Sequence, residues 1–194
     1  MPRTEEQNEK IKNERKQQIL NAAMLLFSKQ NPAEVSIAKI AKEAGVSKGL
    51  MYSYYESKEH LQKEIVFQCM DEIMSIFQMD KGAFVDAQDF RERIDRLFDH
   101  VQNNITTWSI YTQLLMQPSM KEVFMSPKVL EMMEDYQRQL YQYMTNQGFE
   151  DPEKEIVIMG ALIDGISVQY VSAPEFIDLN VVRNHIKDVY GKEN

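Results

Sequence analysis

The side chains best suited to chemistry in this chain are cationic and hydroxyl groups between Lys48 and Lys58. The two lysines carry ammonium groups, and Tyr52 and Tyr54 carry phenolic hydroxyls that donate hydrogen bonds. Groups of both kinds contact the phosphates of DNA, which supply much of the affinity of a protein for a duplex. Gly49 has no side chain, so the backbone beside it could approach a DNA strand closely. These residues therefore predict a surface that binds double-stranded DNA.

Two short helices would position these side chains. The sequence predicts them at 36–44 and 47–55, joined by a tight turn. Ser36 and Ser47 stand where a side-chain oxygen can cap the start of each helix. Gly45 can adopt the left-handed conformation that ends a helix and turns the chain. This arrangement is a helix-turn-helix, whose second helix can enter the major groove of DNA.

The same segment resembles a known family of regulators. The similarity lies in the run Ala44-Gly45-Val46-Ser47-Lys48-Gly49, then Tyr52, Tyr54-Tyr55 and Ser57-Lys58-Glu59-His60-Leu61. These residues resemble the signature of the tetracycline-repressor (TetR) family over roughly residues 15–65, while beyond them only chain length and helical layout fit. The resemblance implies a dimeric transcription regulator, usually a repressor that a small ligand releases from DNA.

The resemblance also implies which residues contact DNA. The positions that match common contacts of the family are Ser36, Ser47, Lys48, Gly49, Tyr52, Tyr54 and Lys58. Leu50 and Ser53 belong to the same helix but depart from the family pattern. Leu50 stands where Thr is frequent, and it could meet a thymine methyl instead. Ser53 stands where larger side chains are frequent, so we expect weak base discrimination at each half-site.

Charge is distributed unevenly along the 194 residues, whose net charge is −8. Residues 1–58 hold ten Lys or Arg against seven Asp or Glu, whereas the remainder holds twelve against twenty-three. The acidic part would repel DNA and help to orient the mildly basic end toward it. Because the basic excess is small, we expect DNA binding to need two DNA-binding domains, or heads, that act together in a homodimer.

Composition and pattern predict an all-α protein. Only seven Gly and six Pro occur, and long segments are rich in good helix formers. We expect a helix-turn-helix DNA-binding domain at 1–56 and a helical effector-binding and dimerisation domain at 57–194. Residues 1–10 are expected to fray, and a long helix from 57 to about 79 joins the two domains. Other helices are predicted at 13–28, 88–105, 108–117, 127–147, 152–172 and 178–190.

A pocket for a small effector is expected in the second domain. The chain has 13 Met, and Met and aromatic side chains gather between residues 108 and 144, as in many apolar pockets. A Met-rich helical core would give the same pattern, so both interpretations stay open, and the family resemblance favours the pocket for an apolar or aromatic ligand. The candidate pocket residues are Trp108, Tyr111, Leu115, Met120, Phe124, Tyr136, Leu140 and Asp164.

The last two helices are candidates for a dimer surface. The helix at 152–172 is apolar nearly all round, which is not typical of a surface helix in a monomer. Its apolar run at 156–171 is short for a membrane span and contains Asp164, so we expect no membrane contact. Asp164 could be a hydrogen-bonded structural carboxylate, hold a polar ligand atom or seal the interface. The candidate interface residues are Gly160, Ile163, Gly165, Tyr170, Val182 and Ile186.

The sequence offers little support for catalysis, metal binding or cofactors. His60, His100 and His185 are far apart and lack the spacing of a metal site. We find no Gly-rich phosphate loop, nucleophile elbow or other catalytic motif. The single cysteine, Cys69, and the absence of a signal peptide pattern predict a cytoplasmic protein.

Together these observations predict a cytoplasmic, homodimeric transcription regulator that binds a palindromic operator and is released by a small effector. Two alternatives stay open. One is a ligand-independent architectural or division factor with the same DNA-binding head. The other is a helical enzyme or protein-interaction module that merely contains this motif.

Overall fold

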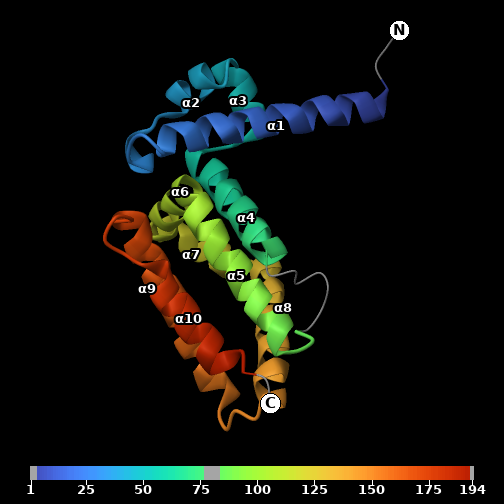
Figure 1. The fold of residues 1–194 in the computed structure, drawn as a ribbon. Coiled ribbons are helices and arrows are strands. Elements are labelled where there is room, and N and C mark those ends of the chain that lie inside the picture. The colour runs from blue at the N-terminus through green and yellow to red at the C-terminus, as the bar shows by residue number, and fades with distance from the viewer. Residues whose placement is uncertain (1–3, 77–83, 193–194) are drawn as a thin grey trace.

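The chain folds into helices throughout the part that the computed structural model describes, residues 4–76 and 84–192 (Figure 1). The all-α class is therefore confirmed. The head consists of α1 (Glu5–Phe27), η1 (Pro32–Glu34), α2 (Ile37–Glu43) and α3 (Lys48–Tyr54). The connecting helix is α4 (Lys58–Ile76). The body consists of α5 (Ala87–Asn103), α6 (Ile105–Leu115), η3 (Pro118–Met120), α7 (Lys121–Phe124), α8 (Pro127–Asn146), α9 (Pro152–Ser172) and α10 (Leu179–Tyr190).

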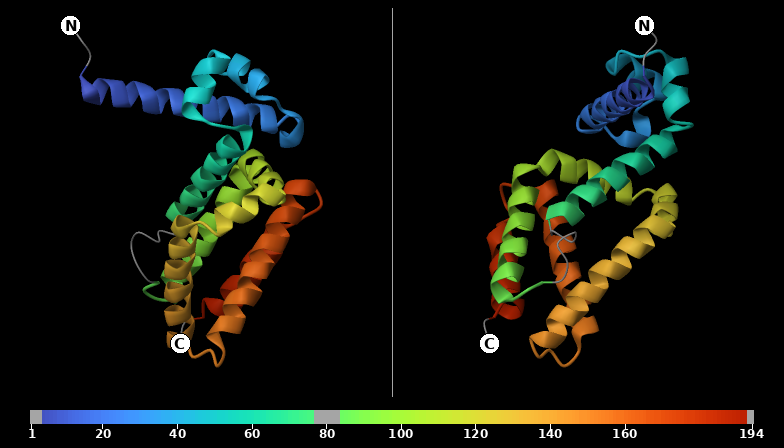
Figure 2. Two further views of the ribbon diagram at one scale, coloured as in Figure 1. Left: turned by 180° about the vertical axis from the view of Figure 1, so that it is seen from behind. Right: turned by 90° about the vertical axis from the view of Figure 1, so that its right-hand side faces the viewer.

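The first helix begins earlier than predicted. We expected residues 1–10 to fray, but α1 starts at Glu5 and its first half projects beyond the head (Figure 2). The reason is a capping box, in which the Thr4 side chain accepts from Gln7 N and the Gln7 side chain accepts from Thr4 N. Acidic residues in the first turn add favourable interactions with the helix dipole.

The body helices lie within a few residues of their predicted positions. Two short elements, η1 and the pair η3–α7, were not predicted. Both 3-10 helices begin at a proline, and such short turns carry too few residues for a periodic pattern. The predicted end of the connecting helix near residue 79 lies outside the described residues.

One hydrophobic core runs from the head into the body. Ile40 and Met51 of the head are fully buried in it together with Leu61 and Ile65 of α4. The same cluster continues through Leu114 of α6 and reaches α7 and α8. The head is therefore joined to the body by close packing along α4 (Figure 2).

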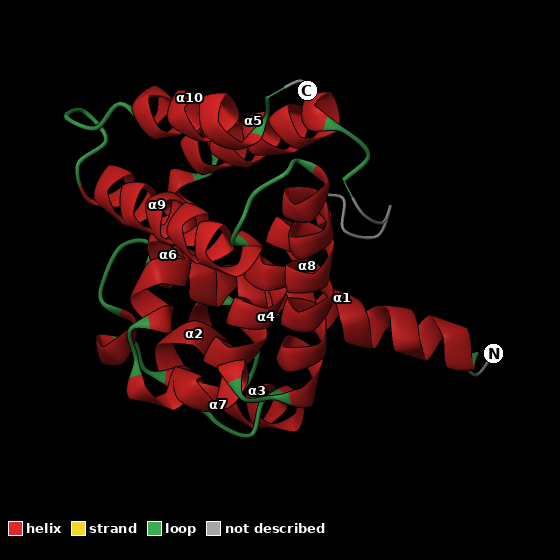
Figure 3. Ribbon diagram, turned by 90° about the horizontal axis from the view of Figure 1, so that it is seen from below, coloured by secondary structure: helices red, strands yellow, loops and turns green. Residues whose placement is uncertain are grey.

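A second core occupies the far end of the body. The rings of Phe90 and Tyr143 stack with centroids 4.8 Å apart, and Tyr143 Oη donates to the Tyr190 carbonyl at 2.7 Å. Ile186 of α10 is completely buried there. Seen from below, α5 and α10 lie side by side and α9 crosses beside α8 (Figure 3).

An ion-pair cluster locks α10 onto α5. Asp95 accepts hydrogen bonds from Arg183 Nε at 2.6 Å and from Lys187 Nζ at 2.7 Å, and Arg183 also reaches Asp99 at 2.8 Å. Partial burial opposes ionisation of Asp95. The hydrogen bonds and positive charges of the two partners outweigh that effect and hold the pKa of Asp95 below its ordinary value.

Asp95→Asn tests this cluster. Because the folded-state pKa is lowered, the stabilisation is present above the ordinary Asp pKa of about 4 and is lost as pH falls through the folded-state value. We expect the variant to lose about 1 kcal/mol of unfolding free energy at pH 7 and to approach the wild type near pH 3. Urea denaturation at both pH values measures this difference.

Asp99→Asn is the matched control, because Asp99 is more exposed and has one partner in the cluster. Its effect at pH 7 should be smaller than that of Asp95→Asn. An equal loss for Asp95→Asn at both pH values would contradict an electrostatic origin.

Candidate DNA interface and effector pocket

The turn between α2 and α3 is fixed by local hydrogen bonds. Gly45 has φ +64°, a conformation that glycine adopts without strain. Gly45 N donates to Lys42 O at 3.1 Å and Val46 N donates to Ala41 O at 2.9 Å, which satisfies the carbonyls at the end of α2. Ser47 Oγ then accepts from Leu50 N at 3.1 Å and starts α3. The predicted helix-turn-helix is confirmed in both helices, and Ser36 caps α2 in the same way.

The outer face of α3 carries the predicted contact residues. Met51 and Tyr55 point into the core, which leaves the opposite face of the helix in solvent. Tyr52 is 45% exposed and Leu50 is 39% exposed, both unusual for large apolar side chains. The exposed residues of this face are Lys48, Gly49, Leu50, Tyr52 and Ser53. This exposed face is the surface that could enter a groove of DNA.

Tyr54 and Lys58 are less available than the residues of that face. Tyr54 is half-buried and packs against the core of the head. Lys58 Nζ donates to the carbonyls of Pro32, Ala33 and Val35 at 3.1, 2.8 and 3.1 Å. Lys58 thus ties the start of α4 to η1, a role that the sequence did not reveal because η1 was not predicted. A phosphate contact by Lys58 stays a prediction.

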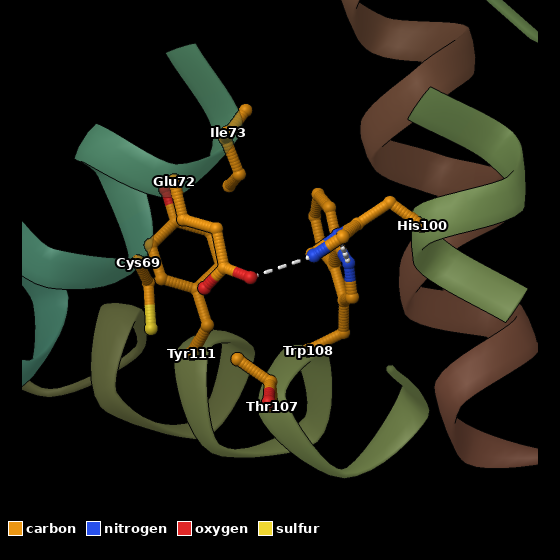
Figure 4. A pocket seen from close by; sticks show the side chains of 7 residues that line it. All are labelled: Cys69, Glu72, Ile73, His100, Thr107, Trp108 and Tyr111. Carbon is orange, nitrogen blue, oxygen red and sulfur yellow. Dashed lines mark hydrogen bonds and ion pairs between the residues drawn. The ribbon is translucent and has the colours of Figure 1, made fainter. Parts of the chain in front are cut away.

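Three helices meet at His100 in the upper body (Figure 4). His100 Nδ1, on α5, accepts from Trp108 Nε1 of α6 at 3.0 Å, so the ring proton lies on Nε2. Nε2 lies 2.9 Å from Glu72 Oε1 of α4 and donates to it. The adjacent cavity, about 10 Å³, could hold at most about one water molecule. This cluster therefore couples helices and is too small to be an effector site.

A larger cavity of about 400 Å³ lies among α4, α5, α6, α7, α8 and α9. Its size suits a small organic ligand. Six of the eight residues predicted for the effector line it, namely Trp108, Tyr111, Leu115, Phe124, Tyr136 and Asp164.

The other two predicted pocket residues do not line this cavity. Met120 is fully buried in the core shared with the head, and Leu140 is buried in the second core. They were misassigned because apolar side chains of a helix point either to a core or to a cavity, and composition alone does not distinguish the two.

The cavity also contains residues that the sequence did not single out. α9 contributes Gly160 and Ile163, which were predicted for the dimer surface, together with Ser167 and Val168. The missed residues from other helices are Met70, Ile73, Met74, Leu97, Thr112, Met116 and Met133. The spacing of Gly160, Ile163 and Ser167 repeats at three and four residues, and this periodicity was the available signal.

The dimer-surface candidates are only partly exposed. Ile186 is fully buried inside the protomer, so its predicted place in an interface is wrong. Tyr170 and Val182 pack partly against the second core, and Gly165 is half-buried. The exposed apolar residues of these helices are instead Val157 and Ile158, with Ala161 and Val168, on one side of α9, and Val181 on α10.

The exposed side of α9 has a further implication. By length and composition, α9 is the one helix in the described residues that could cross a membrane, yet only 17% of its apolar window is buried in the single chain. An apolar helix face left in water is unfavourable and marks an interaction site. We name this side, Val157, Ile158, Ala161 and Val168, the α9 face.

The electrostatics of the larger cavity centre on Asp164. Burial raises the pKa of its carboxyl group above the ordinary value. Burial, together with the nearby charge of Asp164, also raises the pKa values of Tyr111 and Tyr136, so both phenols stay neutral. Among the described residues, no group of three or more metal-ligating side chains occurs, and the cavity holds one ionisable acid in an apolar wall.

Comparisons with known proteins agree with this architecture. The family described as bacterial regulatory proteins, tetR family, matches residues 19–65. The HTH-type transcriptional regulator HbdR of Aromatoleum sp. (strain CIB) is 35% identical over 71 residues, which cover 37% of this chain and 29% of that protein's length. The HTH-type transcriptional regulator BetI 1 of Chromohalobacter salexigens is 26% identical over 179 residues, which cover 87% and 85% of the two chains.

A solved structure shows the same fold over nearly the whole chain. The fatty acid degradation regulator FadR of Bacillus halodurans superposes with a TM-score of 0.71 at 19% identity, covering 91% of this chain and 94% of that chain. An exposed recognition helix on a three-helix head, joined to an all-helical body, defines a helix-turn-helix DNA-binding regulator. More narrowly, residues 19–65 match the tetR family of bacterial regulatory proteins, and the relatives that match most of the chain are also HTH-type transcriptional regulators.

The first prediction from this site concerns Lys48, which is exposed and makes no hydrogen bond to the rest of the described protein. We expect Lys48→Ala to weaken operator binding roughly tenfold. The slope of log affinity against log salt concentration should also become shallower by about 1 for each DNA-binding head. Fluorescence anisotropy at several salt concentrations measures both quantities. Lys121→Ala on α7 removes the same charge from the body and should leave binding unchanged. Equal slopes for all three proteins would exclude Lys48 as a phosphate contact.

The second prediction concerns Cys69, which lies beside the Glu72–His100 pair (Figure 4). Burial, followed by the charge of Glu72, raises the pKa of Cys69 to about 12. Since the thiolate is the reactive form and its fraction at pH 8 falls about 1,000-fold, the folded protein should react with a thiol reagent about 1,000-fold more slowly than the urea-unfolded protein. Rapid labelling of the folded protein would show that the α4–α6 contact opens frequently.

Proposed function

We propose that this regulator is a homodimeric repressor whose operator affinity falls when a small apolar or aromatic effector occupies the larger cavity. The observation that carries the proposal is the position of α4. This helix contributes Met70, Ile73 and Met74 to the cavity wall, and its first turn is bonded to the head through Lys58. A ligand that displaces α4 would therefore displace the head as well.

The proposed DNA-binding set is the exposed face of α3 with its neighbours. It comprises Ser36, Ser47, Lys48, Gly49, Leu50, Tyr52, Ser53, Tyr54 and Lys58. The functional division falls after residue 56, with DNA binding before it and effector binding and dimerisation after it. We infer a location in the cytoplasm, where DNA and small metabolites are both accessible.

A dimer would give the switch its sensitivity. Two heads bind a palindrome together only when their spacing matches half-sites about 34–36 Å apart, or a multiple of that distance. The α9 face supports this assembly, because pairing with a second copy would remove Val157, Ile158 and Val168 from water. A small rotation of α4 in each protomer would change the spacing of the heads and lower operator affinity.

His100 supports one route between the cavity and α4. Trp108 lines the larger cavity and also donates to His100, which in turn bonds Glu72 on α4. A ligand that moves the indole ring would disturb both hydrogen bonds. Release still requires that the ligand bind the non-operator arrangement more tightly, because equal affinity for both arrangements would shift nothing.

Selection of bound fragments from a random DNA pool near physiological salt tests the proposal. We expect one palindrome to be enriched by the wild type and lost with Lys48→Ala and with Tyr52→Ala. Both side chains are exposed, so both variants should unfold at the wild-type temperature. The recovered operator then serves to screen small molecules for loss of binding.

The outcomes separate the remaining possibilities. A palindrome whose binding responds to no molecule in the screen would favour a ligand-independent DNA-binding factor. Enrichment of a single, non-repeated half-site would contradict the dimer. The absence of any enriched sequence would contradict operator recognition by the unliganded protein.

A further inference from the structure

The larger cavity has an unbalanced charge. Among the described residues that line it, Asp164 contributes one carboxylate and none is Lys, Arg or His. Aromatic rings surround the space, contributed by Trp108, Tyr111 and Tyr136 on α6 and α8. The faces of such rings carry partial negative charge and attract cations. Both features of the wall therefore favour a positively charged group over a negatively charged one.

Two polar groups of α9 lack partners in this wall. Ser167 is 3% exposed, lines the cavity, and its Oγ has no hydrogen-bond partner. Asp164, one turn earlier, is exposed at the cavity and makes no hydrogen bond or ion pair with any other described residue. A buried polar group such as Ser167 Oγ is rarely left unsatisfied, because it costs free energy that a partner would recover. A residue pair spaced by three lies on one side of a helix, so one ligand group can reach both.

We propose that the effector of this cavity is an amphipathic amine, an ammonium group with N–H donors on an apolar or aromatic body. The ammonium lies against Asp164 and donates to Ser167 Oγ, while the body fills the space between the aromatic rings and the methionines of α4. This inference rests on the proposed role of the cavity as the effector site and specifies the chemical class of the effector.

Charge and hydrogen bonding discriminate between ligands with the same body. An ammonium would pair with the Asp164 carboxylate beside an apolar wall, where an ion pair is stronger than in bulk water. A carboxylate ligand would bring a second negative charge beside Asp164, and no described residue of the lining is a cation that could offset it. A neutral alcohol would satisfy Ser167 but leave the charge of Asp164 unpaired. The expected order of affinity is amine, then alcohol, then carboxylate.

Three compounds that differ only in their polar group test the order: 4-phenylbutylamine, 4-phenylbutanol and 4-phenylbutyrate. Calorimetric titration of the full-length protein gives the three dissociation constants, and displacement from the selected operator gives the functional response. We expect the amine to bind at least tenfold more tightly than the alcohol and to weaken operator binding. The carboxylate should bind most weakly.

Variants identify the groups responsible. Asp164→Asn should weaken amine binding about tenfold and leave alcohol binding unchanged, and Ser167→Ala should weaken amine binding a few-fold. Because Asp164 is exposed and makes no hydrogen bond or ion pair with another described residue, Asp164→Asn should fold as well as the wild type. Glu131→Gln, at an exposed position of α8 outside the cavity, removes one negative charge as a control.

Each other outcome overturns a defined part of the inference. Equal binding of amine and alcohol, unaffected by Asp164→Asn, would overturn the ammonium class and leave the cavity as the effector site. Tightest binding by the carboxylate would do the same. Binding of none of the three compounds, with operator binding intact, would overturn both the class and the role of the cavity.

Discussion

The structure depends on the packing of α4, which has to fit two environments at once. Leu61 and Ile65 complete the core beneath α2 and α3, while Met70 and Ile73 reach the body and the larger cavity. Polar contacts fix the same helix along its length, because Lys58 bonds the loop before α2 and Lys63 pairs with Glu122 of α7. Asp71 pairs with Lys128 of α8. The head therefore has no flexible linker, and its orientation follows that of α4.

How much the sequence predicts depends on how local the signal is. The helix-turn-helix was predicted correctly because its determinants lie within a few residues of each other, namely two serine caps and one glycine in the left-handed conformation. Local signals also mark the starts of two body helices, since Pro127 and Pro152 are the first residues of α8 and α9. The early start of α1 was missed because a Thr–Gln capping box leaves a weaker pattern than an apolar stripe.

Tertiary assignments were harder, and α9 shows why. A helix that is apolar nearly all round has no polar stripe to mark its solvent side. The sequence therefore could not tell which side faces the cavity and which faces solvent. Gly160 and Ile163 were placed on the dimer surface and lie in the cavity wall, whereas Val157 and Ile158 carry much of the exposed surface. The hydrogen bonds of Lys58 were hard to predict for another reason, since its three carbonyl partners lie more than twenty residues away in the sequence.

The position of Trp108 has a spectroscopic consequence. It is the only tryptophan among the 194 residues, and it stands with one edge toward Tyr111, 5.9 Å between ring centroids, and its Nε1 bonded to His100. Indole emission depends on the polarity and hydrogen bonding around the ring. The tryptophan emission of this chain therefore originates at one point, where the wall of the cavity meets the contact with α4. Excitation of the indole therefore reports on the contact between the cavity wall, His100 and α4 with no added label.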